Sequence, residues 1–199
     1  MRQEIINIYK FDELPEPAKV QAIEDFRREM PAAWTEENRA TLEAFCNIFP
    51  VQVRDYSYSS CDGFAWADFI DDDHKNLTGL HLAKHIYNQY FDSITQGKYY
   101  STGGKYIDGK YTYKCRHSKI IVDSSCPLTG YYMDDAILRP VFDFLKKPDN
   151  RTFEELIQDC LCAWSTACVQ AMADQESDEY IIDAIQANEY EFLESGEML

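Results

Sequence analysis

A capping box opens a long apolar stripe in the last third of the chain, and this stripe constrains the fold more than any other feature. Within the box, Thr152 and Glu155 can each bind the backbone N–H of the other residue. The apolar residues behind it recur at helical spacing: Phe153, Leu156, Ile157, Cys160, Leu161, Trp164, Cys168 and Ala171. Other elements have to cover a stripe of this length, so we predict a long helix at the centre of the core.

Helical spacing also begins near residues 16, 35, 78, 141 and 177. In the helix near residue 78, we expect Leu80, Tyr87 and Phe91 to share the buried arc. Pro140 is expected in the first turn of the helix over 141–146, because proline lacks the N–H that an interior position needs.

Alternating patterns predict strands at 4–9, 51–59, 63–69 and 189–193. In the second of these, Val51 and Val53 are expected on one face, and Tyr56 and Tyr58 on the other. Asp108 and Gly109 predict a two-residue hairpin turn between 105–107 and 110–113. The chain is therefore expected to be an α+β protein, with a mostly antiparallel sheet and helices packed on one face.

Length and composition favour one folded body. With 199 residues and 45% hydrophobic content, we expect a single compact domain over 1–199 that ends in a solvated acidic segment, 174–199. The start lacks the apolar region of a signal peptide, and no run approaches the roughly 18 apolar residues of a membrane span. The 7 cysteines are odd in number and irregularly spaced, which indicates free thiols. These features predict a cytoplasmic protein with no membrane partner and leave the oligomeric state open.

Charge is divided unevenly along the chain. Residues 174–199 carry nine Asp or Glu and no Lys or Arg, whereas residues 97–120 carry six Lys or Arg and one acid. The formal net charge is −16. A protein this acidic repels nucleic acids and anionic membranes, and it is attracted to the basic grooves of proteins that hold nucleic acid.

Two stretches at opposite ends of the chain resemble a family of phage, prophage and plasmid proteins. Residues 11–24 match the family's opening pattern F-x-E-L-x-x-x-A-K-x-x-A-I-E, and residues 187–192 match its closing pattern A-N-E-Y-E-F. Pro15 stands where the family has a capping Ser. Its members are often labelled antitoxin of a toxin–antitoxin stability system. The resemblance implies a mobile-element origin and raises the expectation of a protein that disarms a host defence.

These observations favour a non-enzymatic inhibitor that acts in the cytosol of the host cell. The expected partner is a host nucleic-acid-handling defence protein, with a CRISPR effector or a restriction enzyme favoured. Carboxylates would occupy a Lys- and Arg-lined groove, and aromatic side chains would anchor the complex. The acidic contacts expected are Asp71, Asp72, Asp73, Glu189, Glu191 and Glu194.

Two other kinds of binding remain open. The basic segment 98–119 interleaves cations with tyrosines, which suits single-stranded nucleic acid because bases stack on aromatic rings and cations neutralise phosphates. Its candidate contacts are Tyr106, Lys110, Tyr111, Tyr113, Lys114 and Arg116. The same segment would also be explained by a plain solvated hairpin, or by a charge match within the chain or with a partner. An antitoxin that neutralises a partner toxin is the second alternative.

No pattern predicts catalysis, a metal or a cofactor. His81 and His85 have zinc-ligand spacing, but they are expected on the solvent side of their helix, where a metal would need outside ligands such as His74 or Asp73. Cys160 and Cys168 are expected to be buried, with Cys162 on the opposite side of the helix. The acids at 68–73 lack the spacing of a calcium loop, and the chain has no nucleophile motif.

Overall fold

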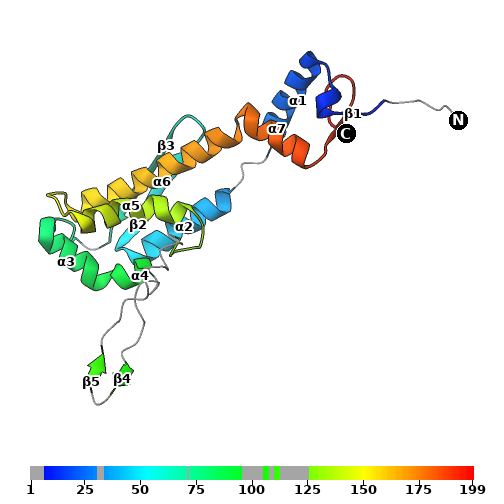
Figure 1. Ribbon diagram of the computed structural model, residues 1–199. Helices are drawn as coiled ribbons and strands as arrows, with labels where there is room; N and C mark the ends of the chain where they lie inside the picture. Colours follow the sequence, from blue (N-terminus) through cyan, green and yellow to red (C-terminus); the bar gives the residue numbers. More distant parts are fainter. Residues whose placement is uncertain (1–6, 31–33, 71, 96–104, 108–109, 113–125) are drawn as a thin grey trace. The chain divides into compact units, whose positions relative to one another are not determined.

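A computed structural model describes residues 7–30, 34–70, 72–95, 105–107, 110–112 and 126–199 (Figure 1). The helices are η1 (Phe11–Glu13), α1 (Glu16–Glu29), α2 (Thr35–Ile48), α3 (Gly79–Gln89), α4 (Phe91–Thr95), α5 (Met133–Lys146), α6 (Phe153–Gln175) and α7 (Asp178–Ala187). The strands are β1 (Tyr9–Lys10), β2 (Val51–Tyr58), β3 (Gly63–Phe69), β4 (Lys105–Ile107), β5 (Lys110–Thr112) and β6 (Glu191–Phe192). Within these residues the strands form three antiparallel pairs, β1–β6, β2–β3 and β4–β5. The predicted α+β class is confirmed, with a small sheet component.

The chain divides into two compact units. One, which we call the end unit, joins the two termini, Met1–Ala33 and Gln170–Leu199. The other, the central unit, is Trp34–Val169. Helix α6 supplies residues to both units.

Helix α6 organises the core of the central unit, as its stripe predicts. Seven of the eight stripe residues are buried and Ala171 is partly buried. The capping box is present: the Thr152 N–H donates to Glu155 Oε2 at 2.8 Å, and the Glu155 N–H donates to Thr152 Oγ1 at 3.1 Å. Further along, the Trp164 indole N–H donates to the backbone oxygen of Asn38 at 3.1 Å, which satisfies the one polar atom of a fully buried ring.

The β2–β3 hairpin covers part of α6. The rings of Tyr56 and Tyr58 meet the Trp164 ring edge to face, at centroid distances of 5.5 and 5.6 Å. The ladder shifts register between Val53 and Asp55. The expectation that Tyr56 and Tyr58 face away from Val51 and Val53 is therefore wrong, because a bulge adds one residue and turns the rest of the strand over.

Helix α5 begins earlier than the sequence predicts. Pro140 lies inside the helix, not in its first turn. An interior proline costs about 3 kcal/mol, but α5 buries one apolar face on both sides of it, and that burial keeps the helix continuous. The buried apolar residues of α5 are Met133, Ile137, Leu138, Val141 and Phe144.

A buried carboxylate fixes the start of α5. Asp134 is fully buried and accepts hydrogen bonds from the backbone N–H groups of Leu128, Thr129 and Gly130, at 2.8 to 3.0 Å. The hydroxyls of Thr129 and Thr41 also donate to it, at 2.8 and 3.2 Å. Five donors replace the water that this carboxylate loses on burial.

Helix α3 buries a different face from the one predicted. Leu82 and Ile86 are buried, whereas Leu80 and Tyr87 are 77% and 54% exposed. His85 is partly buried and packs its ring against Phe153. The predicted arc is wrong because Leu80 and Tyr87 match the helical period as well as Leu82 and Ile86 do, so the period alone does not identify the buried pair.

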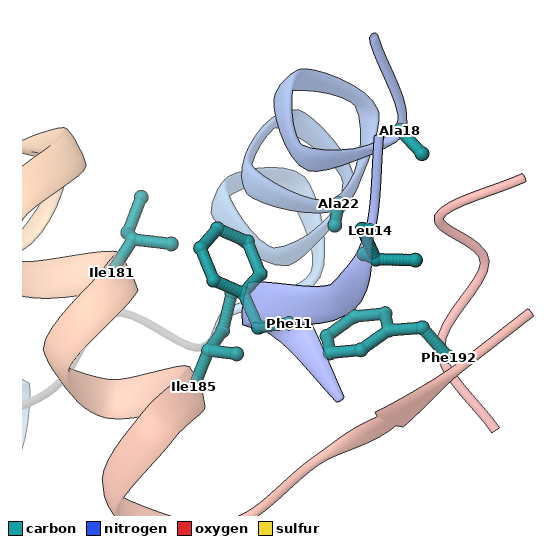
Figure 2. Packing of buried hydrophobic residues seen from close by; sticks show 7 residues of the cluster. All are labelled: Phe11, Leu14, Ala18, Ala22, Ile181, Ile185 and Phe192. Carbon is teal, nitrogen blue, oxygen red and sulfur yellow. The ribbon is translucent and has the colours of Figure 1, made fainter. Parts of the chain in front are cut away.

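The core of the end unit comes from both ends of the chain (Figure 2). Strands β1 and β6 pair, with Tyr9 opposite Phe192 and Lys10 opposite Glu191. Figure 2 shows the buried side chains of η1 and α1 meeting those of α7 and β6. They are Phe11, Leu14, Ala18, Ala22, Ile181, Ile185 and Phe192.

Candidate partner-binding surface

The negative charge of the chain is concentrated in the end unit. This unit carries five Lys or Arg against sixteen Asp or Glu, a balance of −11. The central unit, with more than twice as many residues, carries fourteen against nineteen, a balance of −5. The end unit is therefore the part of the chain whose field attracts a cationic partner most strongly.

Each basic side chain that the structure describes in the end unit lies beside an acid. Lys10 and Glu191 lie 3.8 Å apart, Lys19 and Glu16 3.1 Å, and Arg28 and Asp25 3.0 Å. Arg27 pairs with Asp178 and also donates to the backbone oxygen of Glu176 at 2.9 Å. Every Lys or Arg that the structure describes in this unit is thus in an ion pair, which leaves an excess of acids on a folded frame.

The three predicted acids near the C-terminus gather around β6. Glu189, Glu191 and Glu194 are all exposed. The Lys10 ammonium donates to the backbone oxygen of Glu189 at 3.1 Å, so β1 holds this segment in place. Glu189 has a φ of +54°, a left-handed conformation that is uncommon for a residue other than glycine. Sequence spacing indicates the three acids but gives no sign that Lys10 lies beside them.

The other predicted acids lie in the central unit. Asp72 and Asp73 are exposed in the turn after β3, and Asp72 pairs with Lys75 at 2.7 Å. Asp71 lies outside the described residues. The two acidic clusters belong to different units, and each is considered as a separate candidate contact.

The basic, tyrosine-rich segment contains the predicted hairpin. Tyr106 pairs with Tyr111, and Ile107 pairs with Lys110. Three of its predicted contacts, Tyr113, Lys114 and Arg116, lie outside the described residues. The strand pairing is confirmed; nucleic-acid binding by this hairpin stays a prediction.

Sequence reasoning missed an aromatic surface on the β2–β3 hairpin. Phe64 and Trp66 are 39% and 54% exposed, on the face of β3 opposite to the one that packs on α6. Ile70, just beyond the strand, is 71% exposed. The signal that could have revealed this surface is the adjacent charged pair Arg54 and Asp55, which interrupts the alternation of β2 where the bulge occurs.

The histidines and cysteines considered as metal ligands are divided between core and surface. The expectation that His85 lies on the solvent side of its helix is wrong, because its ring packs against the buried Phe153. The His85 ring stacks on the His74 ring at a centroid distance of 4.5 Å, and His81 is exposed. Cys160 and Cys168 are buried and Cys162 is exposed, as predicted. Burial raises the pKa of Cys168 to about 12 and that of Cys46 to about 11, which removes thiolate character. Among the described residues, no group of three His, Cys, Asp or Glu side chains could hold a metal ion.

A shallow hollow lies beside β1, lined by Asn7, Ile8, Tyr9 and Glu13. Its acidic group, the Glu13 carboxylate, accepts a hydrogen bond from the Lys10 N–H at 2.8 Å. This hydrogen bond closes a turn at η1.

In the described part of the chain, no helix combines the length and the apolar character that crossing a membrane requires. No protein-family model matches the sequence, and neither a curated protein nor a solved structure matches it.

Proposed function

We propose that this chain is a non-enzymatic inhibitor that binds a host nucleic-acid-handling defence protein through an acidic surface. The observation that carries the proposal is the −11 charge of the end unit, in which each described Lys or Arg is already paired with an acid. A CRISPR effector or a restriction enzyme is the favoured partner, since such a protein presents a groove of Lys and Arg to phosphates. The carboxylates of the end unit would take the place of those phosphates.

The end unit suits this role because its acids stand on a folded frame. Acids on a flexible tail would lose conformational freedom on binding, whereas acids on packed helices and strands have already lost it. Glu191 lies on β6, and Glu189 is held by Lys10. Individual exposed ion pairs contribute only about 0.2–1 kcal/mol each, so the affinity would come from many acids acting together and would weaken as salt is added.

The family resemblance supports the same assignment. Residues 11–24 and 187–192 lie far apart in sequence, yet Phe11 and Phe192 meet edge to face at a centroid distance of 6.2 Å (Figure 2). The resemblance therefore falls on residues that build the frame of the acidic unit. A mobile-element origin, which the resemblance implies, fits a protein that disarms a host defence.

The test is capture of partners from host lysate by the tagged full-length chain, after nuclease treatment and at low salt. We expect one defence protein at near-stoichiometric level. The triple variant Glu189→Lys, Glu191→Lys and Glu194→Lys should weaken its binding at least tenfold. The matched control reverses three acids of the central unit, Glu36, Glu43 and Asp143, and so changes the net charge equally. Equal affinities for the two triple variants would show that the β6 acids are not contacts.

Single-stranded nucleic acid is the second candidate ligand, since β4 and β5 pair in the register that the basic hairpin requires. A retarded band with an oligonucleotide at low ionic strength, abolished by Lys110→Glu, would favour it. An antitoxin role would be favoured by a small basic toxin encoded beside this chain.

A further inference from the structure

The outer face of the β2–β3 hairpin departs from the pattern of a solvated sheet. The inner face packs on α6: Ala65 is 2% exposed, and the Phe69 ring meets Phe153 at a centroid distance of 5.2 Å. The opposite face of such a hairpin is normally polar, because it faces water. Here it carries Phe64 and Trp66, with Ile70 beyond the end of the strand.

The exposed aromatic residues are flanked by carboxylates. Asp55 is the cross-strand partner of Trp66, so the two side chains leave the ladder on the same side, about 5 Å apart at their Cβ atoms. Asp68 follows Trp66 by two residues on the same strand and is also exposed. The nearby cation, Arg54, lies 3.9 Å from Asp68. A tryptophan face beside carboxylates attracts a cation both through the ring quadrupole and through charge.

Charge decides among the possible occupants of this face. A second copy of the chain would bring another −16, and a nucleic acid or an anionic membrane would bring phosphates. A cationic protein segment is the occupant whose charge complements both the face and the whole chain. Arginine suits it better than lysine, because the planar guanidinium stacks on an aromatic ring and can bind a carboxylate with two parallel hydrogen bonds.

From this geometry we infer that the outer face of the β2–β3 hairpin is a docking site for an arginine-bearing segment of a partner protein. A guanidinium would stack on Trp66 and bind Asp55, while Phe64 and Ile70 would cover the aliphatic part of the same segment. The inference rests on the proposed function, since it specifies how a basic partner would be held, and it adds a contact surface in the central unit to the acids of the end unit.

The test compares two peptides of equal charge, hexa-arginine and hexa-lysine, titrated into the full-length chain at low salt by calorimetry. General attraction to the acidic surface favours both peptides, so the part of their affinity ratio that depends on Trp66 reports on stacking. We expect hexa-arginine to bind about fivefold more tightly, which corresponds to about 1 kcal/mol for one stacked guanidinium. Trp66→Thr, which keeps a strand-forming residue, should reduce this ratio to about one.

The control is Tyr87→Gln on α3, which removes an aromatic side chain that is also 54% exposed. This variant should keep the fivefold ratio. If Trp66→Thr does not fold, the indole N–H resonances of the wild-type chain give the answer: Trp66 should shift on addition of hexa-arginine, while the buried Trp164 should not. A ratio that Trp66→Thr leaves unchanged, or a Trp66 resonance that does not move, would overturn the inference.

Failure of the inference is distinguishable from failure of the proposed function. If both peptides bind equally well, the acidic surface still attracts cations, so only the docking site is refuted. If neither peptide binds at low salt, the chain does not attract basic segments, and both proposals fall.

Discussion

Gly196 offers a direct test of how the two ends of the chain are joined. Its φ is +92°, and a Cβ atom placed on it would lie 2.3 Å from the backbone oxygen of Ala18. Gly130, in the central unit, has nearly the same φ of +88°, but a Cβ there would meet no atom within 4 Å. Both glycines therefore have a left-handed backbone, but only at Gly196 would an added methyl group clash with a neighbouring segment.

The change is to alanine at each position in turn. Left-handed backbone costs a residue other than glycine about 1–2 kcal/mol, and Gly130→Ala should cost this much. Gly196→Ala should cost about 1–3 kcal/mol more, because the chain has to move away from Ala18 to admit a methyl group and thereby disturbs the packing of β6 on α1. The free energy of unfolding of the end unit should fall by about 2–5 kcal/mol in total.

Native-state hydrogen exchange is the assay, because it reports the opening free energy of each unit separately. In Gly196→Ala, the amides of α1 and α7 should lose protection together while those of α5 keep theirs. Equal costs for the two variants, or loss of protection in α7 without any loss in α1, would refute the packing of the two ends as one unit.

Three further predictions follow from individual side chains. Asp134→Ala should destabilise the chain by about 3–5 kcal/mol in chemical denaturation, because it leaves five donors without their acceptor. Asp134→Asn should cost less than half as much. Similar costs for the two variants would contradict the role of Asp134 as the acceptor of these hydrogen bonds. Thiol titration at pH 8 should label the exposed Cys61 and Cys162 rapidly and the buried Cys168 only on unfolding; rapid labelling of all three would contradict the packing of α6. Hydrogen bonds from the N-cap Thr152 hold the pKa of Glu155 below its usual value. The stability that Glu155 contributes is therefore fully present above its pKa in the unfolded chain, and it is lost as pH falls through the lower pKa of the folded chain. The protection factors of amides in the first turn of α6, which are corrected for the pH dependence of intrinsic exchange, should therefore fall in acid. Glu155→Gln should abolish most of that fall, and an equal fall in this variant would refute the capping role.

The elements that could be predicted from sequence are those whose signals are local. The capping box and stripe of α6 identify a buried helix because the 3.6-residue period and the end signals coincide at the same residues. The hairpin of β4 and β5 follows from Asp108 and Gly109, since few other sequences favour that turn. Burial of Cys160 and Cys168, with Cys162 outside, follows from the angle between successive residues of a helix.

The elements that could not be predicted depend on contacts distant in sequence. Beyond the bulge, the tyrosines of β2 pack on Trp164, which lies more than one hundred residues away, and a local pattern does not report that contact. Likewise, Pro140 lies inside α5 because tertiary burial outweighs the intrinsic cost of proline in a helix. The pairing of β1 with β6 brings Lys10 beside Glu191, and no local pattern reports a contact between the two ends of a chain.

The candidate binding surfaces also combine features that local sequence signals predict with features that depend on distant contacts. Acid counts along the sequence identify the charge of the C-terminal segment, but only the fold shows that residues near the N-terminus complete the same unit. The exposure of Phe64 and Trp66 depends on which face of the β2–β3 hairpin meets α6. The bulge in β2 changes which residues of that strand lie on this face.

Competition is the measurement that tests the central claim most directly. The captured defence protein would be titrated with its own nucleic-acid substrate in the absence and presence of increasing amounts of this chain, at matched salt. If the acids of the end unit occupy the basic groove, the apparent affinity for nucleic acid should fall in proportion to the chain added, and the Glu189→Lys, Glu191→Lys and Glu194→Lys variant should restore it. A ternary complex in which the nucleic acid binds with unchanged affinity would contradict the account.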